Sequence, residues 1–173
     1  MWNGAFTAMI DAVLDSGPLI HLAEIDALDV ISDFSTLFVA EAVSDEVSRH
    51  QPAALDYALN FHVISAPSPS VALRILARTL SLDRGELEAL SLMEHNCHAI
   101  FLTDDSAARI AAEERGFRVH GTIGLIIRAA RKGHRTRLEV VDLLRTIPHN
   151  SSLYIKPSLL DEIISSLLDE WHL

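Results

Sequence analysis

Five short apolar segments alternate with amphipathic helical patterns along the chain, and this alternation limits the possible folds more than any other feature. The five segments cover residues 9–14, 37–40, 62–65, 99–103 and 117–120. Between them, apolar residues recur at helical spacing, as at Ala42, Val43 and Val47. Strands that alternate with helices favour a parallel sheet covered on both faces. We therefore expect an α/β fold of three layers, α/β/α, with a mostly parallel central sheet of four or five strands.

The length and composition favour one domain. The chain has 173 residues, of which 49% are apolar, and this is enough to bury one sizeable core. No apolar stretch approaches the roughly 18 residues of a membrane-spanning helix, because Asp11 and Arg128 interrupt the longest candidates. The first seven residues lack the basic cluster and apolar stretch of a secretory signal. The sequence therefore predicts a single-domain, cytoplasmic protein that does not enter a membrane.

The formal net charge of −10 argues against a general polyanion-binding protein, since nonspecific affinity for nucleic acids comes mainly from lysine and arginine. A nucleic-acid function would need bound metal and a local basic patch. The only dense basic stretch contains Arg128, Arg131, Lys132, Arg135 and Arg137. These cations could guide an RNA backbone, or they could complement the dipole of a helix that ends at Gly133. Arg109, one helical turn after Asp105, could likewise contact a phosphate or pair with that aspartate.

Cysteine and histidine offer no second kind of site. Cys97 is the only cysteine, which excludes an intramolecular disulfide, a zinc ribbon and a redox pair. The nine histidines show no zinc-binding spacing, and His95 and His98 flank a turn that enters the fourth predicted strand. A surface turn explains these two histidines better than a metal site does.

Acidic residues follow two of the predicted strands. Asp15 ends the apolar run of the first strand, and Asp104 and Asp105 end that of the fourth. Ligands bind beyond the carboxyl ends of the strands in an open parallel sheet. One such aspartate commonly just caps the following helix. Several unpaired carboxylates at one edge repel one another, however, and need a cation or a proton.

Glu46 extends this group, because the helical pattern of residues 42–50 allows its side chain to point toward a strand end. Four or five carboxylates without cysteine or histidine ligands suit one or two hard cations, Mg²⁺ or Mn²⁺. Such ions favour phosphodiester hydrolysis: one lowers the pKa of an attacking water, and a second, about 3.5–4 Å away, can stabilise the departing oxygen.

Several motifs in a fixed order resemble those of a known family. They are residues 13–22, which contain a Ser-Pro-Leu-Ile type turn, and residues 43–47, 82–90, 102–109 and 121–125. Together they resemble the PIN domain family. The similarity spans residues 9–133, and we expect the helical extension at 134–173 to pack on the same core. The resemblance implies a PIN-like α/β/α fold and an enzyme that cleaves RNA.

The resemblance also implies roles for single residues. The metal-binding, catalytic acids would be Asp15, Glu46, Glu86 and either Asp104 or Asp105.

Two further assignments concern the neighbours of these acids. Glu86 is preferred to Glu88, because it directly follows Gly85 and the two glutamates lie about 200° apart around a helix. Ser16 and Thr103 could donate hydrogen bonds to the metal ligands, or they could simply act as caps.

Three functions remain open at this point. The leading hypothesis is a Mg²⁺- or Mn²⁺-dependent endoribonuclease, and the resemblance implies the toxin of a toxin–antitoxin pair: a homodimer inhibited by a small antitoxin protein. A noncatalytic PIN-like module that binds RNA or protein is the alternative, and the acidic net charge favours it. An aspartyl phosphotransfer domain ranks lower, because it needs a lysine near the nucleophile and none occurs before Lys132.

Overall fold

The structure is a computed structural model, and it describes residues 10–173. Its centre is a five-stranded parallel sheet in the order β3-β2-β1-β4-β5. The strands are β1 (Ile10–Leu14), β2 (Phe34–Ala40), β3 (Phe61–Ile64), β4 (Ile100–Leu102) and β5 (Arg118–His120). The predicted α/β/α class is confirmed. Met9, where the first strand was expected to begin, lies outside the described residues.

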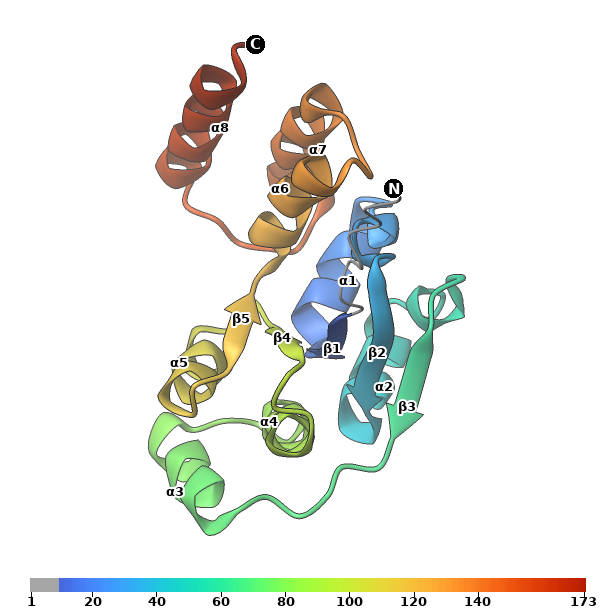
Figure 1. Cartoon of the computed structure of the whole chain (residues 1–173), viewed down its shortest axis with the longest axis vertical. Helices are drawn as coiled ribbons and strands as arrows, with labels where there is room; N and C mark the ends of the chain where they lie inside the picture. Colours follow the sequence, from blue (N-terminus) through green and yellow to red (C-terminus); the bar gives the residue numbers. More distant parts are fainter. Residues whose placement is uncertain (1–9) are drawn as a thin grey trace, which may run out of the picture.

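Eight α-helices occur in the described part of the chain (Figure 1). They are α1 (Ser16–Glu24), α2 (Glu41–His50), α3 (Val71–Leu80), α4 (Arg84–His95), α5 (Ser106–Glu114), α6 (Thr122–Lys132), α7 (Arg137–Asn150) and α8 (Pro157–Trp171). Because crossovers between parallel strands are right-handed, α1 and α2 pack on one face and α4 and α5 on the other. None of the described helices is long and apolar enough to span a bilayer.

The central position of β1 sets the geometry of the site. Its residues Ala12, Val13 and Leu14 are fully buried, as expected for a strand covered on both faces. Leu14 is in register with Val39 of β2 and with Leu102 of β4. The residues that follow these strands therefore meet at one edge, which we call the carboxyl edge of the sheet.

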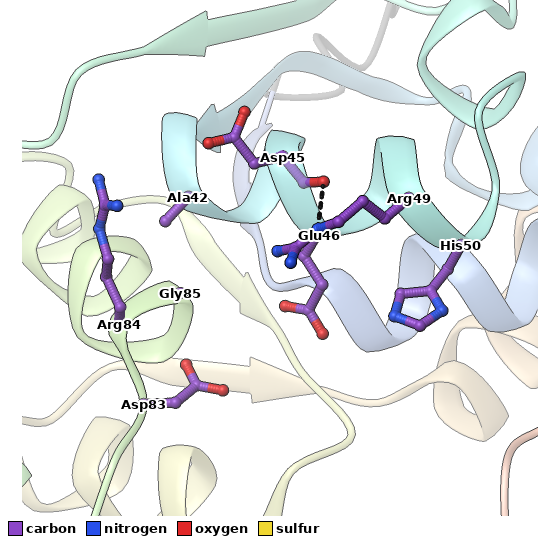
Figure 2. Close-up of a pocket in the computed structure, with 8 residues that line it drawn as sticks. All are labelled: Ala42, Asp45, Glu46, Arg49, His50, Asp83, Arg84 and Gly85. Carbon is purple, nitrogen blue, oxygen red and sulfur yellow. Dashed lines mark hydrogen bonds between the residues drawn. The ribbon is translucent and has the colours of Figure 1, made fainter.

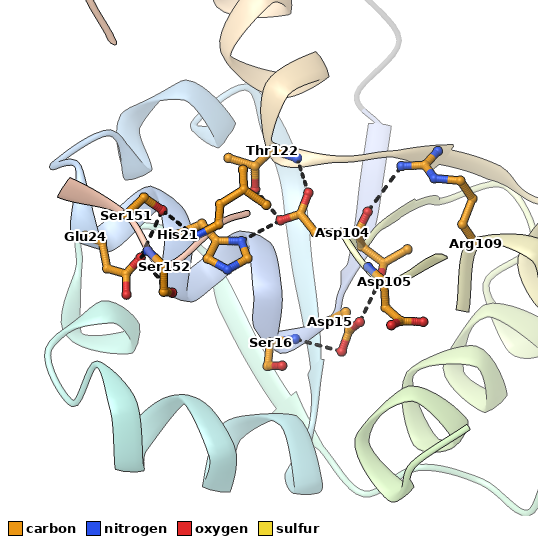
Figure 3. Close-up of polar contacts among 12 residues, drawn as sticks. Asp15, Ser16, His21, Glu24, Asp104, Asp105, Arg109, Thr122, Ser151 and Ser152 are labelled. Atoms are coloured by element: carbon orange, nitrogen blue, oxygen red, sulfur yellow. Dashed lines mark hydrogen bonds and ion pairs between the residues drawn. The ribbon is translucent and has the colours of Figure 1, made fainter. Parts of the chain in front are cut away.

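The C-terminal helices belong to the same hydrophobic core. Helix α7 packs on α6 and α8 packs on α7, and their buried apolar residues are continuous with those of the sheet. Glu24 of α1 accepts hydrogen bonds from the hydroxyl groups of Ser151 and Ser152, in the loop between α7 and α8 (Figure 3). The C-terminal helices are thus also tied to the first crossover by polar contacts.

One predicted helix boundary is wrong. The sequence pattern placed a break at residues 148–152, whereas α7 continues through Pro148 to Asn150. Proline lacks the amide that would bond to the carbonyl four residues earlier, but only two helical residues follow it here. The predicted start of the last helix at Pro157 is confirmed.

Candidate functional site

Asp15 is a buried carboxylate at the carboxyl edge, directly after the central strand. Only 4% of its surface is exposed. Its Oδ1 accepts a hydrogen bond from the Ser16 amide at 2.8 Å, and its Oδ2 accepts one from the Thr103 hydroxyl at 2.7 Å (Figure 3). Burial raises the pKa of Asp15 to about 6 despite these hydrogen bonds, and the charges of Asp83 and Glu46 add to the effect. The two hydrogen bonds therefore do not fully offset the cost of burying the ionised carboxylate.

Thr103 and Ser16 both donate a hydrogen bond to Asp15, but they use different groups. Thr103 uses its hydroxyl group, which is fully buried with the rest of the side chain. Ser16 uses its backbone amide, because Asp15 is itself the N-cap of α1. The amide contact would survive replacement of the serine side chain.

Glu46 of α2 and Asp83, the N-cap of α4, approach the edge from two helices that pack together. A Cβ atom at Gly85 would lie 3.4 Å from Asp83 Oδ1 and 3.6 Å from Glu46 Oε2. Both carboxylates therefore adjoin this glycine (Figure 2). Sequence reasoning took residues 83–85 only as a helix break and missed Asp83. The signal for it was its position three residues before Glu86, which is the spacing of a capping box.

Glu86 completes that capping box. Its carboxylate accepts a hydrogen bond from the Asp83 amide at 2.8 Å, and its own amide donates to Asp83 Oδ1 at 2.8 Å. Burial raises the pKa of Glu86 to about 7, with further repulsion from Asp83, Asp105 and Asp15. The pKa of Glu86 is therefore affected by acids at three places: the start of α4, the start of α5 and the end of β1.

Glu88 serves a different purpose. Its carboxylate accepts hydrogen bonds from the Ala42 amide at 3.1 Å and from Arg84 Nε at 2.7 Å. Glu88 thus binds an otherwise free amide in the first turn of α2. Its negative charge is paired there.

The doubled aspartate after β4 divides between two environments (Figure 3). Asp105 is the N-cap of α5: its Oδ1 accepts a hydrogen bond from the Ala108 amide at 2.8 Å, and its charge contributes to the raised pKa of Glu86. Asp104 points to the other side, where its Oδ2 lies 2.7 Å from His21 Nδ1 and 2.6 Å from the Thr122 hydroxyl. Its Oδ1 accepts the Thr122 amide at 2.7 Å.

The surroundings of Asp104 stabilise its negative charge. Burial alone would raise the pKa of Asp104, but the hydrogen bonds from His21 and Thr122 outweigh it and hold the pKa below its ordinary value. A Cβ atom at Gly121 would lie only 2.9 Å from Asp104 Oδ1, so this close approach requires glycine. Asp104 therefore joins β4 to α1 and to the start of α6.

The basic stretch expected to guide RNA lies elsewhere. Arg128 forms two hydrogen bonds with Asp33, at 2.7 and 2.5 Å, and its guanidinium lies 4.7 Å from the centre of the Phe34 ring. Asp33 immediately precedes β2, so this contact is at the amino edge of the sheet, opposite the acids. Arg131 and Lys132 lie further along α6 in its last turn. The structure does not bring this stretch to the carboxylates.

Other cations lie closer to the acids. Arg109 donates a hydrogen bond to the Thr103 carbonyl at 3.3 Å, and its only ion pair in the described chain is a 4.0 Å contact with Glu113. The expected alternative, a pair with Asp105, is therefore absent from the described contacts. Arg49 and Arg84 line a pocket of about 340 Å³ between α2 and α4 that also includes Glu46 and Asp83 (Figure 2). Sequence reasoning did not single out these two arginines.

The donor set suits a hard cation. Five acids face the same part of the carboxyl edge: Asp15, Glu46, Asp83, Glu86 and Asp105. Within residues 10–173, no group of three or more histidine, cysteine, aspartate or glutamate side chains is arranged to hold a metal ion. A hard cation such as Mg²⁺ needs only a few carboxylates, because it keeps several waters. A bound cation would also offset the burial that raises the pKa of Asp15 and of Glu86, together with the smaller contribution from repulsion between the acids.

Comparison with known proteins agrees with this geometry. No curated protein matches the sequence. A family model described as a PIN domain matches residues 11–169, which include all five strands except Ile10 and nearly all of the C-terminal helices. PIN domains are generally nucleases and typically use divalent metals. With its parallel sheet and its acids gathered at the carboxyl edge, the chain belongs to the PIN domain family.

Proposed function

We propose that this protein is a metal-dependent endoribonuclease in which Asp15, Glu46, Glu86 and Asp105 hold Mg²⁺ or Mn²⁺. One observation carries the proposal: the buried Asp15 lies among other acids at the carboxyl edge, and its pKa is raised to about 6. A fold without use for this charge would gain stability by replacing it, since uncompensated buried carboxylates are costly. Membership of the PIN family supports a nuclease activity.

The residues of the chain divide the work. When bound, the cation supplies Lewis-acid chemistry that makes water a stronger nucleophile and neutralises charge on the phosphate. Thr103 and the Ser16 amide fix the orientation of Asp15. Glu46, Glu86 and Asp105 supply the remaining oxygen donors from α2, α4 and the start of α5. Arg109, which donates a hydrogen bond to the Thr103 carbonyl, would contact a phosphate oxygen.

We assign Asp104 a positioning role in place of the ligand role left open by the sequence. Among residues 10–173, its side chain receives hydrogen bonds from His21 and Thr122, which stabilise its charge, and only 13% of the side chain is exposed. It fixes the start of α6 against α1, and thereby the loop that carries Asp105.

The direct test is cleavage of a panel of end-labelled RNAs by the wild type with Mg²⁺, with Mn²⁺ and with EDTA. We expect cleavage only with a divalent metal, and none by Asp15→Asn. Equal cleavage in EDTA would contradict the metal dependence. Full activity of Asp15→Asn with metal still required would contradict the role of Asp15.

A noncatalytic PIN-like module is the second candidate. The net charge of −10 and the ion pairs formed by Arg128 and Arg135 favour it, because they leave few free cations for RNA. Binding of RNA or of a partner protein, without RNA cleavage under any metal condition, would identify such a module.

The partners follow from the same family resemblance. We propose a cytoplasmic toxin of a toxin–antitoxin pair that forms a homodimer and is inhibited by a small antitoxin protein. A neighbouring reading frame whose product abolishes RNA cleavage and co-purifies with this chain would support that role. Light scattering during size-exclusion chromatography would give the oligomeric state.

A further inference from the structure

We infer that the pocket between α2 and α4 binds one unpaired nucleotide of the RNA substrate, with Arg49 and Arg84 contacting its phosphate. The inference rests on the proposed ribonuclease function and extends it to substrate class. At about 340 Å³ the pocket falls at the lower end of the range for small-molecule sites, which is about 300–1,000 Å³.

The position of the pocket connects it with the acids. Glu46 and Asp83 line the pocket, and both charges also act on Asp15. Gly85 adjoins both carboxylates. A nucleotide held in the pocket would therefore place a neighbouring phosphate of the same strand beside Asp15.

Both arginines are oriented by a single contact each. Arg49 Nε donates to the Asp45 carbonyl at 3.1 Å (Figure 2). Arg84 Nε donates to Glu88 at 2.7 Å. Across residues 10–173, the terminal nitrogens of these two side chains make no hydrogen bond to protein. Those nitrogens form the end of the guanidinium that binds phosphate oxygens in pairs. Two oriented guanidinium groups beside a cluster of acids are thus available to an anion that also reaches the metal ligands.

The pocket favours a single strand over a duplex. It is a recess between two helices, and a stacked, paired base cannot enter such a recess without leaving its helix. His50 lines one end of the pocket and offers an aromatic ring on which a base can stack (Figure 2). The expected substrate is therefore a single-stranded segment or a loop.

The test compares two double variants that remove the same charge. Arg49→Gln with Arg84→Gln changes the pocket, and Arg131→Gln with Lys132→Gln changes the basic stretch at the other end of the sheet. The Arg84–Glu88 pair is on the surface, with 75% of the arginine side chain exposed, so its loss should barely change stability. Melting curves of all proteins would check this. The measurements are Mn²⁺-dependent cleavage of a fluorescent single-stranded RNA and its binding in EDTA at several salt concentrations.

We expect the pocket variant to raise KM and Kd by about 10-fold and to change kcat by less than about 2-fold, since two phosphate contacts are lost. Its slope of log Kd against log salt should fall by about 0.7, because both arginines contact the same phosphate and single strands give about 0.7 per neutralised phosphate. The variant at Arg131 and Lys132 should change KM by less than about 2-fold. A hairpin should be cut in its loop, and a duplex of the same sequence should be a poor substrate.

Different failures have different meanings. Equal effects of the two double variants, with normal cleavage by the wild type, would overturn the pocket inference alone. A fall in kcat at unchanged KM would also overturn it, because the arginines would then act in the chemical step. Duplex cleavage as fast as single-strand cleavage would overturn the assignment of an unpaired nucleotide. If the wild type neither binds nor cuts RNA, the proposed function fails as well.

Discussion

Asp104 and the group around Asp15 lie at the same edge of one sheet, yet their environments are opposite. Asp104 receives hydrogen bonds from His21 and Thr122, and these hold its pKa low. Asp15 has other acids nearby, and burial raises its pKa to about 6. Burial acts in the same direction on both carboxylates, so their partners decide the difference. The comparison indicates that one side of the edge serves the fold and the other remains available to a cation.

The largest expected effect is the loss of cleavage in Asp15→Asn. The cation that Asp15 would hold stabilises the transition state by several kcal/mol, so the cleavage rate should fall by about 100-fold or more when this ligand is lost. Folding should be retained, because asparagine caps a helix nearly as well as aspartate. The matched control is Asp11→Asn, at the amino end of the same strand, where the carboxylate accepts a hydrogen bond from Ser35. If both variants lost activity equally, the effect would not be specific to the carboxyl edge.

The neighbouring aspartates should respond in opposite ways. Asp104→Asn should lower the free energy of unfolding by about 2–3 kcal/mol, because it removes the charge in a buried network with His21 and Thr122. Asp105→Asn should leave stability nearly unchanged and reduce cleavage. Urea denaturation and cleavage assays of both variants would check this. A stable, inactive Asp104→Asn protein would reverse the assignment of the two residues.

Asp15 and Asp104 should also affect the pH dependence of stability in opposite directions. The carboxyl groups of Asp15 and Glu86 have native pKa values raised from 3.8 and 4.5 to about 6 and about 7. At pH values between the unfolded and the native pKa of each group, the native state binds more protons than the unfolded state. The free energy of unfolding therefore falls as pH rises through this range. In metal-free buffer we expect Asp15 to account for a loss of about 2–3 kcal/mol between pH 4 and 7. Asp104, whose pKa is lowered, should instead lose its contribution as pH falls below about 4.

Denaturation curves at several pH values would measure these slopes. Asp15→Asn should flatten the decline between pH 4 and 7, and Mn²⁺ at about 100 times its Kd should add about 2.7 kcal/mol to the wild type alone. An unchanged slope in the variant would show that Asp15 is not the group being titrated.

The smallest expected effect separates Glu86 from Glu88. Glu88→Gln should change kcat by less than about 2-fold and reduce stability by about 0.5 kcal/mol, because it weakens a surface ion pair and a contact to the start of α2. Glu86→Gln should mainly reduce cleavage. Parallel kinetic and thermal measurements would test the pair, and a larger kinetic loss in Glu88→Gln would favour the other glutamate as the ligand.

The sequence predicts the layers and the strands well because these depend on local patterns. All five strands occur close to their expected positions along the chain. Strand β2, however, begins at Phe34, three residues before the expected start, because Ser35 and Thr36 interrupt the apolar run. The acids after β1 and β4 could be placed at one edge from strand direction alone. Which aspartate faces the other acids could not, because His21, the partner of Asp104, is 83 residues away.

The remaining differences also come from long-range contacts. The basic stretch looked available for RNA, but Arg128 pairs with Asp33, 95 residues earlier in the chain. Asp83 was missed because the spacing of a capping box predicts only where a helix begins. It does not predict that α2, which carries Glu46, packs against this end of α4. The pocket at Arg49 and Arg84 likewise exists only because α2 and α4 pack together.

The central place of β1 also affects the order in which the chain can fold. During synthesis β1 can pair with β2 early, but its other edge stays unpaired until β4 has been made. The delay is long, because Asp15 after β1 and Thr103 after β4 are separated by 88 positions in the sequence. Pairing over such a separation is slow, and a partly folded chain exposes an apolar strand edge in the meantime. Helices α3 and α4 must therefore emerge before the sheet can close around its first strand, so the acids at the carboxyl edge come together late in folding.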